Sequence, residues 1–207
     1  MSRGAHKLIG ALDAFGVSPE GRRCLDAGAS TGGFTEVLLD RGAREIVAAD
    51  VGYGQLAWSL RSDDRVIVME RTNVRELTAE AIGGPVDLVV ADLSFISLST
   101  VLPALTACAS AQADIVPMVK PQFEVGKERV GAGGVVSDPE LRADAVLTVA
   151  RRAAELGWHA VDVTASPLPG PSGNVEYFLR LRTTTDQPLE GDALVAAVGR
   201  AVAEGPQ

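Results

Sequence analysis

Cysteine and histidine are scarce in this sequence, and their scarcity excludes several kinds of site. Cys24 and Cys108 are the only cysteines in 207 residues, and they form no CxxC pair. Both lie among apolar neighbours, which indicates buried, reduced thiols in a cytoplasmic protein rather than a disulfide framework. His6 and His159 are far apart, and no group of His, Cys and carboxylates has the spacing of metal ligands. We therefore expect no metal site.

Long apolar runs and positive charge are also lacking. The opening SRGAHKL block has no apolar core like that of a signal peptide, and no apolar run approaches the length of a membrane span. The net charge is −8 and the isoelectric point is near 4.8. Nucleic-acid affinity comes largely from Lys and Arg that neutralise phosphates, so this balance disfavours a general polyanion-binding surface. The basic residues gather in two stretches: Arg3, His6, Lys7, Arg22 and Arg23, and Lys120, Lys127 and Arg129. This pattern is compatible with a basic cleft entrance on an otherwise acidic protein.

The sequence does contain a regular alternation of apolar runs and amphipathic stretches. Its 46% hydrophobic and 22% charged residues are ordinary for a folded protein, and its length suits a single α/β domain, residues 1–207. The alternation predicts a mostly parallel, seven-stranded sheet with helices on both faces and one antiparallel strand near its end. Strands are expected at 23–27, 46–49, 66–69, 86–91, 115–119, 158–164 and 175–181, and long helices at 3–15, up to 41, 100–109, 139–156 and around 194–202.

Four polar residues stand where such a sheet would bring them to one cleft. Asp92 and Lys120 directly follow apolar, β-branched runs that are typical of buried parallel strands. Ligands of open α/β sheets bind beyond the carboxyl ends of such strands. Lys7 in SRGAHKL and Glu176 in GNVEYFL complete the set. Each residue alone has an ordinary structural explanation, such as a surface lysine, a helix cap or an edge-strand salt bridge, but their joint placement favours a catalytic site.

A glycine-rich turn after the first strand predicts a cofactor site on the same edge. The predicted cofactor-binding residues are Asp26, Gly28, Ala29, Ser30, Thr31, Gly32, Gly33, Phe34, Asp50, Asn73 and Asp92. Glycines let the backbone approach a ligand closely. Asp26 is expected to support an ammonium group, and Asp50 to accept hydrogen bonds from ribose hydroxyls. Asn73 is a candidate for the adenine edge or for a simple turn. A dinucleotide is the rival ligand, but Ser30 replaces the second glycine of the G-x-G-x-x-G pattern.

Six blocks extend the pattern from Arg3 to about Leu181: SRGAHKL, LDAGASTGGFT, ADLSFISL, VKPQFEVG, GGVVSD and GNVEYF. In their residues and in their order, these blocks resemble those of the TlyA/hemolysin A family of rRNA cytidine 2'-O-methyltransferases, a branch of the FtsJ-like enzymes. The resemblance implies a Rossmann-like fold that uses S-adenosyl-L-methionine to methylate cytidine riboses of 16S and 23S rRNA, with ribosomal RNA or ribosomal subunits as partners. Family members begin with an S4-like RNA-binding domain, whereas only Met1 precedes SRGAHKL here, so we expect an isolated catalytic domain.

The resemblance assigns the chemistry to the four polar residues. A ribose hydroxyl is a poor nucleophile until its proton leaves, so a base must stand beside it. We expect Lys120 to be that base, since burial and the neighbouring cation of Lys7 both favour a neutral amine. Asp92 is expected to orient Lys120 and the hydroxyl, and Glu176 to fix Lys7 or the ribose. Most of the rate gain is expected to come from positioning.

The segment 120–137 contains four glycines and is predicted to be a mobile loop. Because enzymes that modify nucleotides in helical RNA must expose their target, this segment is a candidate clamp. Phe123 and Tyr177 are candidates for stacking on an extruded base, with ordinary packing as the alternative. Three other aromatic side chains are expected in the core or in a pocket wall: Phe34, Trp58 and Phe95.

Two other functions stay open at this point. A small-molecule O-methyltransferase is favoured only by the acidic isoelectric point. A membrane-acting hemolysin, the label attached to the family, would need a membrane span or a basic amphipathic helix, and the sequence offers neither. The oligomeric state cannot be read from the sequence.

Overall fold

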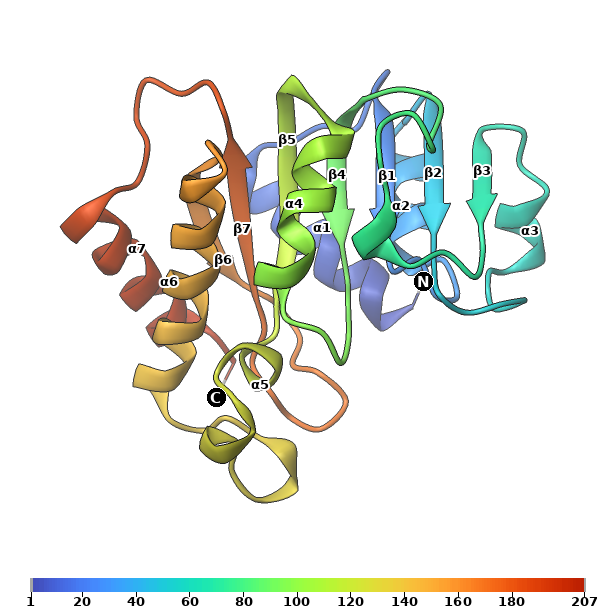
Figure 1. The fold of residues 1–207 in the computed structure, drawn as a ribbon. Coiled ribbons are helices and arrows are strands. Elements are labelled where there is room, and N and C mark those ends of the chain that lie inside the picture. Colours follow the sequence, from blue (N-terminus) through green and yellow to red (C-terminus); the bar gives the residue numbers. More distant parts are fainter. Residues whose placement is uncertain (1, 207) are drawn as a thin grey trace.

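In the computed structural model, which describes residues 2–206, one seven-stranded sheet is flanked by helices (Figure 1). The strands are β1 (Arg23–Ala27), β2 (Glu45–Ala49), β3 (Val66–Met69), β4 (Val86–Ala91), β5 (Ala109–Val119), β6 (His159–Ala165) and β7 (Tyr177–Arg182). The α-helices are α1 (Arg3–Phe15), α2 (Gly33–Asp40), α3 (Trp58–Arg61), α4 (Leu98–Cys108), α5 (Pro121–Glu124), α6 (Pro139–Glu155) and α7 (Gly191–Glu204). Short 3₁₀ turns are η1 (Val74–Glu76), η2 (Lys127–Arg129) and η3 (Ala132–Gly134).

The strand order, β3-β2-β1-β4-β5-β7-β6, decides which loops meet. Strands β1 to β5 pair in parallel, whereas β7 runs antiparallel to both β5 and β6. The carboxyl ends of the parallel strands therefore share one edge. Strand β7 begins at this edge, because Val119 pairs with Tyr177. Lys120 and Glu176, the next residues outward on each strand, consequently lie at the same edge.

Two apolar cores cover the two faces of the sheet. Successive strand side chains point to opposite faces. Leu25 and Ala27 belong to the core formed with α4, α6 and α7, whereas Cys24 belongs to the core formed with α1 and α2. Asp26 shares the face of Cys24 and is fully buried under α2. Both cysteines are buried free thiols, as the sequence predicts.

Several expected boundaries shift by one or two residues, and three expectations are wrong. Strand β5 starts at Ala109, well before the apolar run, because its first residues include polar side chains that the pattern could not identify as strand. The segment 120–137 is not one open loop, since it contains the turns α5, η2 and η3. Trp58 is 77% exposed and is therefore not a core residue, whereas Phe95, which is 91% exposed, belongs to a pocket wall, the other place expected for it. Helix α3 is a single turn beside the edge strand β3, and this position leaves Trp58 largely exposed.

Candidate active site

The four polar residues predicted from the sequence form two ion pairs. Lys7 of α1 pairs with Glu176, the residue before β7, and both side chains are almost completely buried. Lys120 Nζ lies 2.7 Å from Asp92 Oδ1. The loops after the neighbouring strands β4 and β5 carry this second pair. Tertiary structure thus joins residues as far as 169 positions apart.

The Asp92–Lys120 pair is enclosed on the lysine side and open on the aspartate side. The Lys120 side chain is 11% exposed, whereas that of Asp92 is 28% exposed. Lys120 Nζ also donates a hydrogen bond of 2.9 Å to Ser94 Oγ. The lysine head group is therefore held by two oxygen atoms on the loop after β4.

The Lys7–Glu176 pair is fixed by the packing around it. A Cβ atom on Gly170 would lie 2.8 Å from Glu176 Oε1, so the turn before β7 fits closely around the carboxylate. Arg3 at the start of α1 ties down the same turn through a 2.7 Å hydrogen bond to the Pro169 carbonyl oxygen. Because Glu176 neutralises Lys7, the effect of Lys7 on Lys120 is weaker than that of an unpaired cation.

The glycine turn between β1 and α2 requires its glycines. Gly28 has φ +88°, and a Cβ atom there would lie 2.3 Å from the Asp92 carbonyl oxygen. The turn therefore packs directly against the loop that carries Asp92. Ser30, which stands in place of the second fingerprint glycine, adopts a left-handed φ of 49°. Its backbone N–H donates to Asp50 Oδ2 at 2.8 Å, which joins the turn to the end of β2.

Asp26 is a fully buried carboxyl group beneath this turn. Its Oδ2 accepts a 2.7 Å hydrogen bond from Thr35 Oγ1 of α2, whereas Oδ1 has no hydrogen-bond partner among the described residues. Burial raises the pKa of Asp26 to about 7, against the opposing effect of the Thr35 hydrogen bond, and the charge of Asp92 raises it further. A cation bound above the turn would favour the ionised form.

Asp50 and Asn73 already make local hydrogen bonds. Asp50 Oδ1 accepts from the Gly52 backbone N–H at 2.7 Å, in addition to the bond from Ser30. Asn73 caps η1, where its Oδ1 accepts from the Arg75 N–H at 3.1 Å. Each carboxylate oxygen of Asp50 can accept a further bond, so its predicted contact with ribose is compatible with the structure. Asn73 forms the turn that the sequence left as an alternative, and it also lines one of the clefts described next, so its contact with adenine stays a prediction.

Two neighbouring clefts, whose linings share Gly28, Ser30 and Asp92, lie over the turn. One has a volume of about 320 Å³ and is lined by Ser2, Arg3, Gly4, Gly28, Ala29, Ser30, Thr31, Gly33, Phe34 and Asp92. The other has a volume of about 510 Å³, and its lining includes Gly28, Ser30, Asp50, Asn73, Asp92 and Ser94. Nearly all predicted cofactor residues therefore line one or both of these neighbouring clefts. Asp26 and Gly32 lie behind it, because Asp26 is under α2 and Gly32 packs against Leu60.

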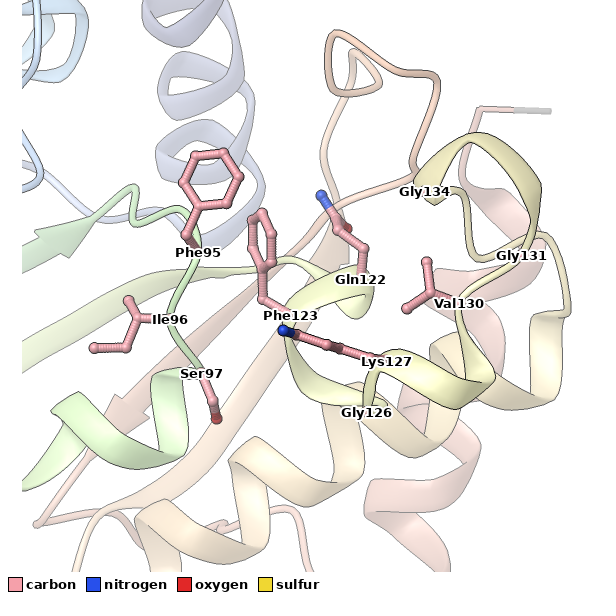
Figure 2. A pocket seen from close by; sticks show the side chains of 10 residues that line it. All are labelled: Phe95, Ile96, Ser97, Gln122, Phe123, Gly126, Lys127, Val130, Gly131 and Gly134. Atoms are coloured by element: carbon pink, nitrogen blue, oxygen red, sulfur yellow. The ribbon is translucent and has the colours of Figure 1, made fainter.

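A third cleft, of about 630 Å³, is lined by residues that follow Asp92 and Lys120 in the chain (Figure 2). The loop after β4 forms one wall through Phe95, Ile96 and Ser97, and the segment after Lys120 forms the other. Phe95 and Phe123 approach each other across it, with ring centroids 5.3 Å apart. Tyr177, in contrast, is fully buried, so its predicted stacking on a base is wrong and the packing alternative holds.

A half-buried carboxylate ties the two walls together. Glu124 of α5 accepts hydrogen bonds from Ser97 Oγ at 2.6 Å and from the Leu98 N–H at 2.7 Å, at the start of α4. A negative charge is favoured at a helix N-terminus. The pKa of Glu124 is raised, mainly by burial. This tie holds the loop of Asp92 against the segment of Lys120.

Sequence reasoning missed three groups with a part in this geometry: Ser94, Thr35 and Glu124. All three lie inside the sequence motifs described above, yet nothing in the sequence distinguishes their hydroxyl or carboxyl groups from those of ordinary surface residues. Among residues 2–206, no group of three or more His, Cys, Asp or Glu is arranged to hold a metal ion, and no helix has the length and apolarity needed to cross a membrane.

Comparison with known proteins gives the class to which this fold and site belong. N-methyltransferase NodS from Bradyrhizobium japonicum superposes with a TM-score of 0.60 at 14% identity, covering 88% of this chain and 95% of that one. At this identity the likeness concerns the fold alone, and it confirms the predicted Rossmann-like methyltransferase architecture. The family model of FtsJ-like methyltransferases matches residues 1–183. The chain belongs to the FtsJ-like methyltransferase family, whose members transfer a methyl group from a donor of the S-adenosylmethionine type.

Two similar proteins narrow the resemblance. The 16S/23S rRNA (cytidine-2'-O)-methyltransferase TlyA of Mycobacterium tuberculosis is 76% identical over 206 residues, which are 100% of this chain and 77% of that protein. The solved structure of a Streptococcus thermophilus protein named as a hemolysin is 39% identical, with a TM-score of 0.90 over 99% of this chain and 74% of that one. The TlyA/hemolysin A resemblance expected from the sequence is confirmed.

Proposed function

We propose that this chain transfers the methyl group of S-adenosylmethionine to the 2'-hydroxyl of cytidine riboses in 16S and 23S ribosomal RNA. The observation that carries the proposal is the Asp92–Lys120 pair, 2.7 Å apart and beside the clefts over the glycine turn. The substrate is supported by the 76% identity with TlyA of Mycobacterium tuberculosis. Ribosomal RNA as substrate would make the cytoplasm the place of action. The seven strands found among residues 2–206 belong to a single sheet, which supports one catalytic domain.

The clefts suit S-adenosylmethionine in their backbone geometry and in their charge. Gly28 gives the close backbone approach that such a ligand needs, and the buried Asp26 Oδ1 is available to a cationic ligand above the turn, directly or through water. When bound, the cofactor supplies a methyl group on a positively charged sulfur that needs no further activation. We assign the turn from Gly28 to Phe34 to the methionine part, and Asp50 and Asn73 to the adenosine.

The four polar residues would then divide the work. Neutral Lys120 takes the proton of the ribose hydroxyl. Asp92 fixes the direction of Lys120 and borders both cofactor clefts. The buried Lys7–Glu176 pair holds α1 and the turn before β7 in place.

The test is single-turnover transfer of labelled methyl groups to ribosomal RNA, with the labelled nucleotides mapped. Lys120→Ala and Lys120→Arg should both lose transfer, because guanidinium cannot give up its proton, while calorimetry should show nearly unchanged cofactor binding. Arg200→Lys, on the exposed side of α7, is the control and should keep full activity. Substantial transfer by Lys120→Arg would remove the base role. Methylation of small hydroxyl compounds but not of RNA would favour the small-molecule alternative.

A further inference from the structure

The hydrogen bonds of Lys120 define a direction for its reactive lone pair. Its Nζ donates to Asp92 Oδ1 at 2.7 Å and to Ser94 Oγ at 2.9 Å. A neutral amine has two N–H bonds and one lone pair. When both N–H bonds are committed to these two oxygens, the rotation of the amine is fixed and the lone pair must point away from both. With Asp92 as the only partner, the amine could still rotate about that one hydrogen bond.

Ser94 is well placed for this role. It lies two residues after Asp92 on the loop that follows β4, and it lines the cleft that also contains Asp50 and Asn73. Its side chain is exposed, so the hydroxyl fills no cavity in the core. The enclosed Lys120 side chain, at 11% exposure, has little solvent available to supply an alternative acceptor.

We propose that Ser94 is a positioning residue that accepts the second N–H of Lys120 and so aims the lysine lone pair at the substrate hydroxyl. This inference rests on the proposed methyl transfer to ribose. The lone pair of Lys120 takes the hydroxyl proton while the ribose oxygen forms a bond to the methyl carbon. The carbon–sulfur bond breaks, and its electron pair stays on sulfur, which becomes a neutral thioether. Lys120 ends as an ammonium and returns its proton to solvent.

The same geometry predicts a change in the pH profile. A hydrogen bond accepted from an ammonium is stronger than one accepted from an amine, so removing the Ser94 hydroxyl disfavours the charged lysine. The rising part of the rate profile should therefore move to lower pH, while the plateau falls. The charged group that contacts the lysine is Asp92, on the loop that also carries Ser94, and the carboxyl edge of the sheet further carries Asp26 under the glycine turn and the mutually neutralised Lys7 and Glu176. None of these is altered by a change at position 94.

The experiment is single-turnover methyl transfer to ribosomal RNA across pH, with saturating cofactor, for four proteins. We compare the wild type with Ser94→Ala, with Ser94→Thr, which keeps a hydroxyl, and with Thr100→Ala, which removes an exposed hydroxyl from α4 nearby. Ser94→Ala should lower the plateau roughly tenfold, about the worth of one ordinary hydrogen bond, and shift the profile to lower pH. Cofactor affinity by calorimetry should stay within about twofold. Ser94→Thr should recover most of the rate, and Thr100→Ala should behave as the wild type.

Three results would overturn the proposal. The first is a Ser94→Ala rate equal to the wild type at every pH. The second is a loss of rate matched by an equal loss of cofactor affinity, because Ser94 would then be part of the cofactor site. The third is a rate loss that Ser94→Thr does not recover. A wild type that transfers no methyl group to ribosomal RNA would overturn the proposed function itself, which makes the two failures distinguishable.

Discussion

Breaking the buried pair of Lys7 and Glu176 should destabilise the fold in a way that depends on which partner is removed. The two side chains are 7% and 2% exposed, so a charge left alone must stay buried or be neutralised. In Lys7→Ala the remaining carboxylate is best neutralised. A glutamate in water ionises at about pH 4.3, and each pH unit above that adds about 1.4 kcal/mol to the cost of protonation. The expected loss of unfolding free energy is therefore about 4 kcal/mol at pH 7.5 and about 2 kcal/mol at pH 5.5.

The sign of this pH dependence follows from proton binding. The folded Lys7→Ala protein holds a proton that the unfolded chain releases, so its deficit grows as the pH rises. Glu176→Gln is the matched variant with the opposite sign. It leaves the Lys7 ammonium buried, and a lysine in water loses its proton at about pH 10.4, so the cost of neutralising it is about 4 kcal/mol at pH 7.5 and shrinks as the pH rises. Both losses are in the range of about 3–5 kcal/mol found when one member of a buried pair is removed.

Urea unfolding followed by circular dichroism at pH 5.5, 6.5, 7.5 and 8.5 measures both slopes. The double variant Lys7→Met with Glu176→Leu removes both charges and should lose less stability than either single variant, because apolar pairs replace buried ion pairs at little cost. Equal losses at every pH in both single variants would refute the reasoning, as would a double variant whose loss is the sum of the two single losses.

Three further predictions concern the cofactor turn and the tie between the loops. Gly28→Ala should cost at least about 2 kcal/mol of stability and abolish cofactor binding in calorimetry, because its Cβ would lie 2.3 Å from the Asp92 carbonyl oxygen at a φ of +88°; unchanged binding would contradict this contact. Burial raises the pKa of Asp26 from 3.8 to about 7, so the wild type should lose up to about 4 kcal/mol of unfolding free energy as the pH rises through that interval. Asp26→Asn should lack this pH dependence. If the unfolding free energies of the two proteins, measured in urea, change with pH in parallel, the result would argue against it. Glu124→Gln should cost about 1–2 kcal/mol of stability, because the cap on α4 becomes weaker. It should also slow methyl transfer more than it weakens cofactor binding. A melting temperature equal to that of the wild type would exclude a stabilising contact between Glu124 and the start of α4.

Local patterns in the sequence were sufficient to predict the sheet and the edge at which the site lies. Apolar, β-branched runs predict β2, β3 and β4 within a residue, since a buried strand needs apolar side chains on both faces. Parallel strands must end on the same side, so the sequence predicts that Asp92 and Lys120 lie at one edge. The glycine turn follows equally from local chemistry, because only glycine adopts the φ of Gly28 without strain.

The tertiary structure decided which of these groups are partners. Lys7 meets Glu176 because the antiparallel register of β7 on β5 carries Glu176 to the carboxyl edge, and neither residue's neighbours in sequence encode that register. The roles of Ser94 and Glu124 likewise depend on the distance between two loops. Exposure of Trp58 is another such outcome, since an apolar residue is buried only if another element covers it. Local sequence determines the shape of each segment, whereas the contacts between segments depend on how the whole chain packs.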